Sequence, residues 1–160
     1  MDKPHPLLKA DAIRDMPEYV RQHQFNENAI RHTRSIGDHL GLRNIGIHLV
    51  RLEPGRESTQ FHFHHQDEEF LYILSGRAIA EIGDEEYEVG PGDFMAFTAH
   101  SLPHSLRNPF DDDLVYLMGG DRSPIDICDY PRIKRRMYRE NGVKQYLDLE
   151  HLHDVDPKVR

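Results

Sequence analysis

The sequence contains a single cysteine, Cys128, so no disulfide can form within the chain. The first ten residues lack an apolar stretch of the secretory type, and no run approaches the roughly 20 apolar residues of a membrane-spanning helix. The 20 basic side chains are outnumbered by 28 acidic ones, and the resulting net charge of -8 argues against nucleic acid as a partner. We therefore expect a cytoplasmic protein that binds neither membranes nor nucleic acid.

The chain has 160 residues, which is enough for one domain and one core of ordinary size. Between residues 30 and 122, short runs of β-branched and aromatic residues alternate with glycine, proline and aspartate, a pattern typical of an all-β domain. The expected strands are Ile45–Leu52, Gln60–His64, Glu69–Leu74, Ala78–Ile82, Glu85–Val89, Phe94–Phe97, His104–Arg107 and Leu114–Met118. Residues 1–29 are expected to form an N-terminal arm, with one short helix over 10–24 interrupted by Pro17. We expect residues 123–160 to be a C-terminal extension packed on or beside the β domain.

The chain is rich in histidine, with 12 in all, and a cluster of them marks the most informative segment. Side chains alternate between the two faces of a strand, so His62 and His64 should point to one side and His65 to the other. Glu69 begins the next strand, and a hairpin pairing would bring its carboxylate beside both imidazoles. His104, at the start of a later strand, can supply a third imidazole.

Three imidazoles and one carboxylate form a nitrogen and oxygen ligand set that suits a divalent transition metal ion, such as Fe, Mn, Zn or Ni. An octahedral ion would keep two positions for water or substrate, whereas tetrahedral zinc would be fully coordinated, as in structural sites. The sequence therefore predicts one metal ion per chain, and the ligand set permits catalysis without requiring it.

The order and spacing of these residues resemble the two signature motifs of the cupin superfamily. The likeness rests on His62-x-His64-(x)4-Glu69-(x)6-Gly76, then Gly90-Pro91-Gly92-Asp93, then His104-(x)3-Asn108. The resemblance implies a double-stranded β-helix, or jelly-roll barrel, with the ion near its centre and a pocket that opens at one end. Two departures stand out. Six residues separate Gly55 from His62 where five are usual, and Thr98-Ala99-His100 replaces the usual Pro-x-Gly. The second departure leaves His100 as an alternative ligand, but the intact spacing from His104 to Asn108 favours His104.

Two classes of function fit this interpretation. In the first, the chain is a metal-dependent enzyme that acts on a small oxygen-rich metabolite, and the resemblance implies isomerase, decarboxylase, lyase or dioxygenase chemistry. No nucleophile motif accompanies Cys128, so the metal would carry the reaction. Proton transfer would then fall to a metal-bound water or to a nearby group such as His48. In the second, the chain is a non-catalytic module that binds or senses a small ligand through the metal.

Three segments carry a narrower likeness: Pro54-Gly55-Arg56, residues 67–76 and residues 92–97. Through them the chain resembles short single-domain cupins of the sugar-phosphate isomerase-like group. A sugar phosphate would need cationic anchors near the pocket, and the candidates are Arg56, Arg77 and Arg107, although no convincing phosphate-binding segment is evident. Phe70, Tyr72 and Leu74 should form an apolar outer face on their strand, which predicts a homodimer. The basic run from Arg132 to Arg139 fits either a solvated face or a docking surface on an acidic partner.

Overall fold

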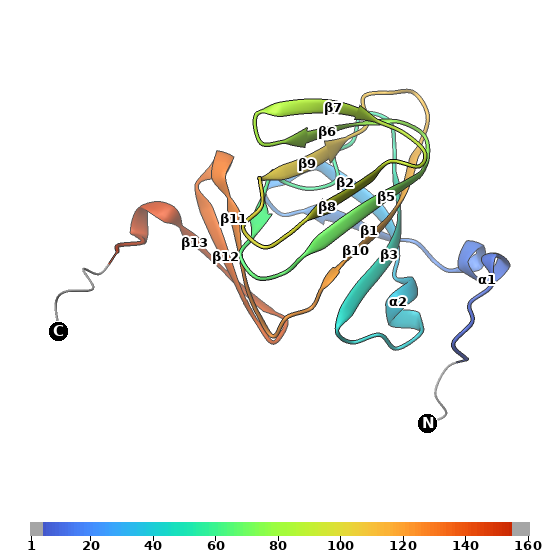
Figure 1. Ribbon diagram of the computed structural model, residues 1–160, viewed down its shortest axis with the longest axis horizontal. Helices are drawn as coiled ribbons and strands as arrows, with labels where there is room; N and C mark the ends of the chain where they lie inside the picture. Colours follow the sequence, from blue (N-terminus) through green and yellow to red (C-terminus); the bar gives the residue numbers. More distant parts are fainter. Residues whose placement is uncertain (1–4, 155–160) are drawn as a thin grey trace.

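The computed structural model describes residues 5–154, and nearly all of its regular structure is β-strand (Figure 1). Its elements in chain order are α1 (Ala10–Asp15), β1 (Tyr19–His23), β2 (Asn26–Arg34), α2 (Ile36–His39), β3 (Ile45–Leu52), β4 (Phe63–His64), β5 (Glu69–Ser75), β6 (Ala78–Ile82), β7 (Glu85–Val89), β8 (Phe94–Phe97), β9 (His104–Arg107), β10 (Leu114–Asp121), β11 (Ile125–Tyr130), the 3-10 turn η1 (Pro131–Ile133), β12 (Arg135–Glu140), β13 (Val143–Asp148) and η2 (Leu149–His151). The all-β prediction is confirmed. Each expected strand has a counterpart, but the one expected over Gln60–His64 is only β4, Phe63–His64, and His62 lies just before it.

The strands form three sheets. A six-stranded sheet has the order β1-β2-β3-β10-β5-β8, a four-stranded sheet has the order β13-β12-β11-β4, and a three-stranded sheet has the order β7-β6-β9. Figure 1 shows the long sheet facing the β7-β6-β9 sheet, with the β11 to β13 strands set to one side. This arrangement is consistent with a double-stranded β-helix.

The core lies on the inner face of the long sheet. Along β5, Leu71 and Ile73 are buried while Tyr72 and Leu74 are exposed, as the two-residue period of a strand requires. The buried apolar residues that pack with them include Val50, Leu52, Ala80, Leu106, Leu114 and Tyr116. The turn after β5 needs a glycine, because Gly76 has a φ of 78° and a side chain there would collide with the backbone of Asp113.

The two ends of the chain contribute strands that were not predicted. The expected helix over 10–24 was wrong in its second half: α1 ends at Asp15, and Met16 is extended because the residue before a proline disfavours the helical region. The β1–β2 hairpin then joins the long sheet through β3. At the other end, β11 pairs with β4, which places Cys128 opposite His64. None of the helices in the described part of the chain has the length and apolar character that a membrane crossing requires.

Candidate metal centre

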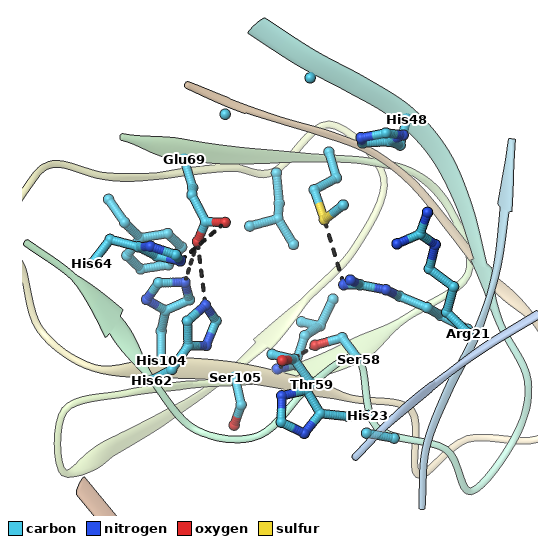
Figure 2. A pocket seen from close by; sticks show the side chains of 18 of the residues that line it. Arg21, His23, His48, Ser58, Thr59, His62, His64, Glu69, His104 and Ser105 are labelled. Atoms are coloured by element: carbon cyan, nitrogen blue, oxygen red, sulfur yellow. Dashed lines mark hydrogen bonds and ion pairs between the residues drawn. The ribbon is translucent and has the colours of Figure 1, made fainter. Parts of the chain in front are cut away.

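Four side chains converge at one end of the interior, and three separate segments position them (Figure 2). His62 and His104, the first residue of β9, form an isolated β-bridge with N···O distances of 3.1 and 2.8 Å, so their rings lie side by side. Glu69 begins β5 and carries the carboxylate between the rings. Its oxygens lie 3.5 Å from Nε2 of His62, 3.6 Å from Nε2 of His64 and 3.4 Å from Nε2 of His104.

The three imidazoles share one orientation, in which Nε2 faces Glu69 and Nδ1 faces a hydrogen-bond acceptor. Nδ1 lies 3.0 Å from the carbonyl oxygen of Gln60 in His62, and 3.4 Å from that of Leu102 in His104. In His64, Nδ1 lies 2.6 Å from Oδ2 of Asp126. Acceptors at Nδ1 hold the proton on that nitrogen, so the Nε2 lone pair can serve as a metal ligand. The donor set and its orientation therefore fit a divalent transition metal ion.

His104 is held in place by an aromatic neighbour. Its ring stacks on Phe97, with centroids 3.5 Å apart and planes within 3°. The alternative histidine lies elsewhere: His100 has a φ of 60°, and its ring contacts His65 at a centroid distance of 4.8 Å. His65 points away from Glu69, as the strand alternation predicted, and its Nε2 lies 3.0 Å from Asp129. The structure thus places His104 beside His62, His64 and Glu69. His100 and His65 lie outside this group.

Asp126 is a part of the site that the sequence analysis missed. It lies on β11, it is fully buried, and its Oδ1 accepts hydrogen bonds from the backbone N–H groups of Gln66 and Asp67. Burial opposes protonation of His64, but Asp126, Cys128 and Glu69 outweigh it and raise the pKa of His64 to about 11. The same imidazole helps to lower the pKa of Asp126 against the effect of burial. Asp126 and His64 therefore form a strong buried pair.

Mutual electrostatic effects also set the charge of the other members of the cluster. Burial lowers the pKa of His62, and the neighbouring His104 and His64 lower it further, although Glu69 acts in the opposite direction. Burial would raise the pKa of Glu69, but the imidazoles of His104, His62 and His64 around its carboxylate hold it well below its usual range. The cluster therefore holds an ionised carboxylate beside a neutral His62.

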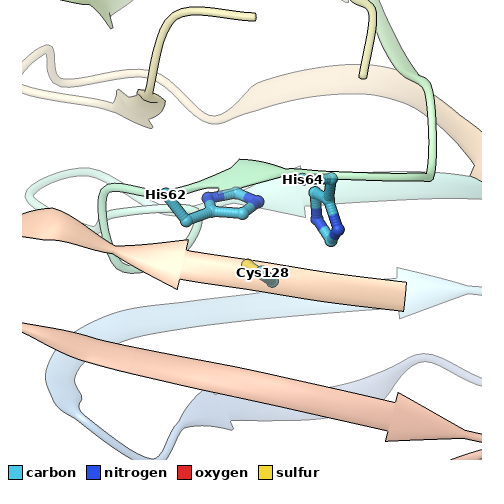
Figure 3. Close-up of side chains that lie close together, drawn as sticks. All are labelled: His62, His64 and Cys128. Carbon is cyan, nitrogen blue, oxygen red and sulfur yellow. The ribbon is translucent and has the colours of Figure 1, made fainter. Parts of the chain in front are cut away.

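Cys128 lies closer to the histidines than its place in the sequence indicated. Figure 3 shows it on β11, next to His62 and His64. Its Sγ and one nitrogen of each histidine lie within 4.8 Å of one another, and its side chain is buried. No cysteine–histidine motif surrounds Cys128 in the sequence, but the pairing of β11 with β4 brings its thiol to the edge of the site.

A cavity of about 460 Å³ opens beside the four converging side chains. His48, the predicted proton-transfer residue, lines it on the side away from Glu69 (Figure 2). Its Nδ1 lies 3.0 Å from Oγ of Ser35, and burial, together with Arg122 and other cations, lowers its pKa despite the opposing effect of Asp38.

The positive charges of the cavity are not the ones that the sequence analysis considered. Arg56, Arg77 and Arg107 do not line it, and Arg107 instead pairs with Glu86 on the three-stranded sheet. The cationic side chains that do line it are Arg21, Arg31, Arg122, Arg139 and Lys144. All come from β1, β2, the β10–β11 connection and the C-terminal strands, whose approach to the cavity has no local signal in the sequence.

Comparison with known proteins gives a consistent result. Residues 48–120 match the family model described as the cupin domain. A curated protein of Methanocaldococcus jannaschii that has no assigned function is 31% identical over 78 residues, which cover 49% of this chain and 54% of that protein. The chain thus spans about half the length of that curated relative.

Two solved structures are similar along almost the whole chain. One is a candidate sugar phosphate isomerase from Acidithiobacillus ferrooxidans, with 39% identity, a TM-score of 0.91 and coverage of 94% of this chain and 96% of that one. The other is a sugar phosphate isomerase of the cupin superfamily from Silicibacter pomeroyi, with 27% identity, a TM-score of 0.80 and coverage of 91% and 94%. A polyketide cyclase from Streptomyces resistomycificus shares only the fold, at 19% identity and a TM-score of 0.60, with coverage of 72% of this chain and 80% of that one.

Proposed function

Because the chain belongs to the cupin superfamily, we propose that it is a metal-dependent enzyme whose ion is bound by His62, His64, Glu69 and His104. One observation carries this proposal: three Nε2 atoms face one carboxylate, while each Nδ1 faces an acceptor. The ligand set suits one divalent ion of Fe, Mn, Zn or Ni. When bound, such an ion supplies Lewis-acid polarisation of substrate oxygens.

We propose isomerisation of a small phosphorylated sugar as the reaction. The support comes from the two solved structures that align along more than 90% of this chain, one described as a candidate sugar phosphate isomerase and the other as a sugar phosphate isomerase. A cavity of about 460 Å³ is within the range of small-molecule sites. Its wall combines polar and charged groups with apolar ones such as Leu71 and Met95, which suits a compact polar metabolite.

Isomerisation between neighbouring carbons moves a proton, and His48 is the proposed carrier. Its imidazole borders the cavity, and its lowered pKa keeps it neutral near pH 7, so it can accept a proton. The hydroxyl of Ser35, 3.0 Å from Nδ1, holds the ring in place. His48→Gln should then reduce turnover while metal content stays unchanged.

The experiment that tests this function is a screen of aldose and ketose phosphates, followed by NMR, with ion-free and reconstituted protein. We expect turnover that needs the metal and that is lost in the His62→Ala/His64→Ala double variant. His65→Ala is the matched control, because His65 lies on the opposite face and should leave turnover intact. Turnover that survives rigorous metal removal would refute the mechanism. Tight ligand binding without turnover would instead favour the non-catalytic binding or sensing module.

We also propose a homodimer formed through the outer face of β5 and β8. Tyr72 and Phe94 are cross-strand neighbours there and are 39% and 62% exposed, and the adjacent Leu74 is 45% exposed. Exposed apolar side chains that are contiguous on one face commonly mark an interface. Sedimentation should therefore give a dimer mass, and a monomer mass at all concentrations would contradict this assignment.

A further inference from the structure

Three cations face the cavity without a carboxylate partner. Arg21 lies on β1, Arg31 on β2 and Lys144 on β13, and all three line the cavity. Within residues 5–154, no carboxylate oxygen lies within 4.0 Å of their charged nitrogens, although most other arginines of this region form such pairs. Arg21 and Lys144 are exposed to solvent and Arg31 is half-buried, so Arg31 is the cation of the three whose charge is least favourable without an anion beside it.

The other two cations of the cavity are already neutralised. Arg122 lies 2.5 Å from a carboxylate oxygen of Asp38, and Arg139 pairs with Asp67. Asp121 also borders the cavity, and its Oδ2 accepts a hydrogen bond from a backbone N–H group, 3.4 Å away. Neither Asp121 nor Glu69, the carboxylates of the cavity wall, lies within 4.0 Å of a charged nitrogen of Arg21, Arg31 or Lys144, so these three cations remain unpaired among the described residues.

The cations are close enough to act on one another. The pKa of Lys144 is lowered, first by partial loss of solvent around its amine and then by repulsion from Arg139, Arg31 and Arg21. Arg31 is half-buried, and the side-chain contact that it makes among the described residues is a weak one, from Nη1 to Sδ of Met118 at 3.7 Å. Most of its N–H donors are therefore available to a ligand.

A buried hydroxyl beside these charges gives an independent indication of a ligand. Tyr116 lies in the cavity wall and is fully buried, yet its Oη has no hydrogen-bond partner among the residues that the structure describes. Arg31 is its neighbour: burial raises the pKa of Tyr116, and both the positive charge of Arg31 and the approach of its side chain to the hydroxyl oppose that rise. Buried hydroxyls are rarely left without a partner, so an unpaired one in a cavity wall points to an oxygen supplied from outside the chain.

We infer that this part of the cavity is an anion subsite, in which Arg31 and Tyr116 bind a phosphate group of the substrate and Arg21 and Lys144 complete the positive surroundings. A phosphate dianion balances three unpaired cations better than a single carboxylate does. The inference rests on the proposed function in taking this cavity as the substrate site. Arg21 lies across the cavity from Glu69, His64 and His104 (Figure 2), so a phosphate held here would leave the other end of the substrate facing the metal centre.

The subsite uses residues that the fold alone does not supply. Tyr116 lies within the matched segment, residues 48–120, but Arg21, Arg31 and Lys144 all lie outside it. The hairpin β1–β2 and strand β13 therefore give this cupin a selectivity for anions that its metal ligands do not specify.

The test is a calorimetric titration of ion-free protein with inorganic phosphate, so that no metal contributes to binding. Wild-type protein should bind phosphate at one site, and Arg31→Gln should weaken that binding by about tenfold to a hundredfold. Arg107→Gln is the matched control, because Arg107 pairs with Glu86 outside the cavity and its loss should change nothing. Failure of wild-type protein to bind phosphate, or equal binding by Arg31→Gln, would overturn the inference.

A second variant guards against a folding defect in the first. Tyr116→Phe removes a hydroxyl without a protein partner, so it should unfold at the same temperature as wild type or a higher one, yet bind phosphate several-fold more weakly. Unchanged phosphate binding in Tyr116→Phe would count against the subsite. Acetate in place of phosphate should bind weakly, and equal binding of the two would show that the subsite is for a carboxylate.

Metal content, measured on the same variants, separates the two proposals. One ion per chain with no phosphate binding would overturn the subsite and leave the metal centre intact. Phosphate binding that depends on Arg31, in a protein that takes up no ion, would support the subsite and refute the proposed metal-dependent function.

Discussion

Replacing Asp126 with asparagine tests whether the buried carboxylate behind His64 prepares that imidazole to bind an ion. Oδ2 of Asp126 lies 2.6 Å from Nδ1 of His64, while Oδ1 accepts hydrogen bonds from the N–H groups of Gln66 and Asp67 at 3.3 and 3.2 Å. Asp126→Asn keeps the shape of the side chain and replaces one oxygen with an NH2 donor. If the amide oxygen stays with the two backbone donors, the NH2 group must face Nδ1 of His64.

This change acts on the nitrogen that faces Glu69. An amide donor at Nδ1 favours the His64 tautomer that carries its proton on Nε2, where the lone pair is needed. The carboxylate that keeps His64 basic is lost at the same time. Loss of a supporting carboxylate of this kind lowers metal affinity by about 10- to 100-fold, or about 1.4 to 2.7 kcal/mol.

The assay is a Co(II) titration followed by absorption, in competition with a chelator of known affinity. Asp129→Asn is the control, because Asp129 lies on the same strand and pairs with His65 and Arg136, which face away from the metal centre. It should retain wild-type affinity. A folded Asp126→Asn variant that binds Co(II) as tightly as wild type would show that Asp126 does not prepare His64 to bind the ion.

The remaining substitutions test other parts of the account. His104→Ala should weaken metal binding far more than His100→Ala in calorimetric titrations, since Nε2 of His104 lies 3.4 Å from Glu69 while His100 contacts the opposite face; equal losses would contradict the assignment. Gly120→Ala should lower metal affinity several-fold, because its Cβ would lie 3.2 Å from Cγ of Glu69 and 2.9 Å from a backbone oxygen, and an unchanged titration would show that the strand adapts. Glu18→Gln should lower the free energy of unfolding by about 1 kcal/mol at pH 7. A hydrogen-bonded arginine lowers the folded-state pKa of Glu18 below its ordinary 4.5, so the difference between the two proteins should be fully present above pH 4.5 and vanish as pH falls through the folded pKa. A difference in denaturant unfolding that persisted at the lowest pH would contradict this.

The central strands could be predicted because their pattern is local. β3, β6, β7, β8 and β9 have the predicted bounds, since alternation and turn residues define them without reference to partners. The outer strands lack that signal: β12 consists largely of charged residues, and β1 is mostly exposed. Their strand conformation depends on pairing with neighbouring strands, and this pairing leaves no alternating apolar and polar pattern in the sequence.

The same distinction applies to the metal centre. His62 and His64 could be placed on one face from their spacing, hairpin pairing indicated Glu69, and the motif resemblance favoured His104 over His100 as the third imidazole. Asp126 could not be predicted, because its contact with His64 joins residues 62 positions apart and depends on β11 pairing with β4. Asp126 and Cys128 are two residues apart and both buried, which indicates that they share the inward face of β11. This pattern does not identify the strand that pairs with β11.

Metal content is the measurement that tests the central claim most directly. Protein purified without an affinity tag or chelator, or reconstituted anaerobically with single divalent metals, should contain one ion per chain by elemental analysis. The His62→Ala/His64→Ala double variant should lose that ion and remain folded. A wild-type protein that takes up much less than one ion per chain with every metal offered, including Fe(II), Mn(II), Zn(II) and Ni(II), would contradict the account.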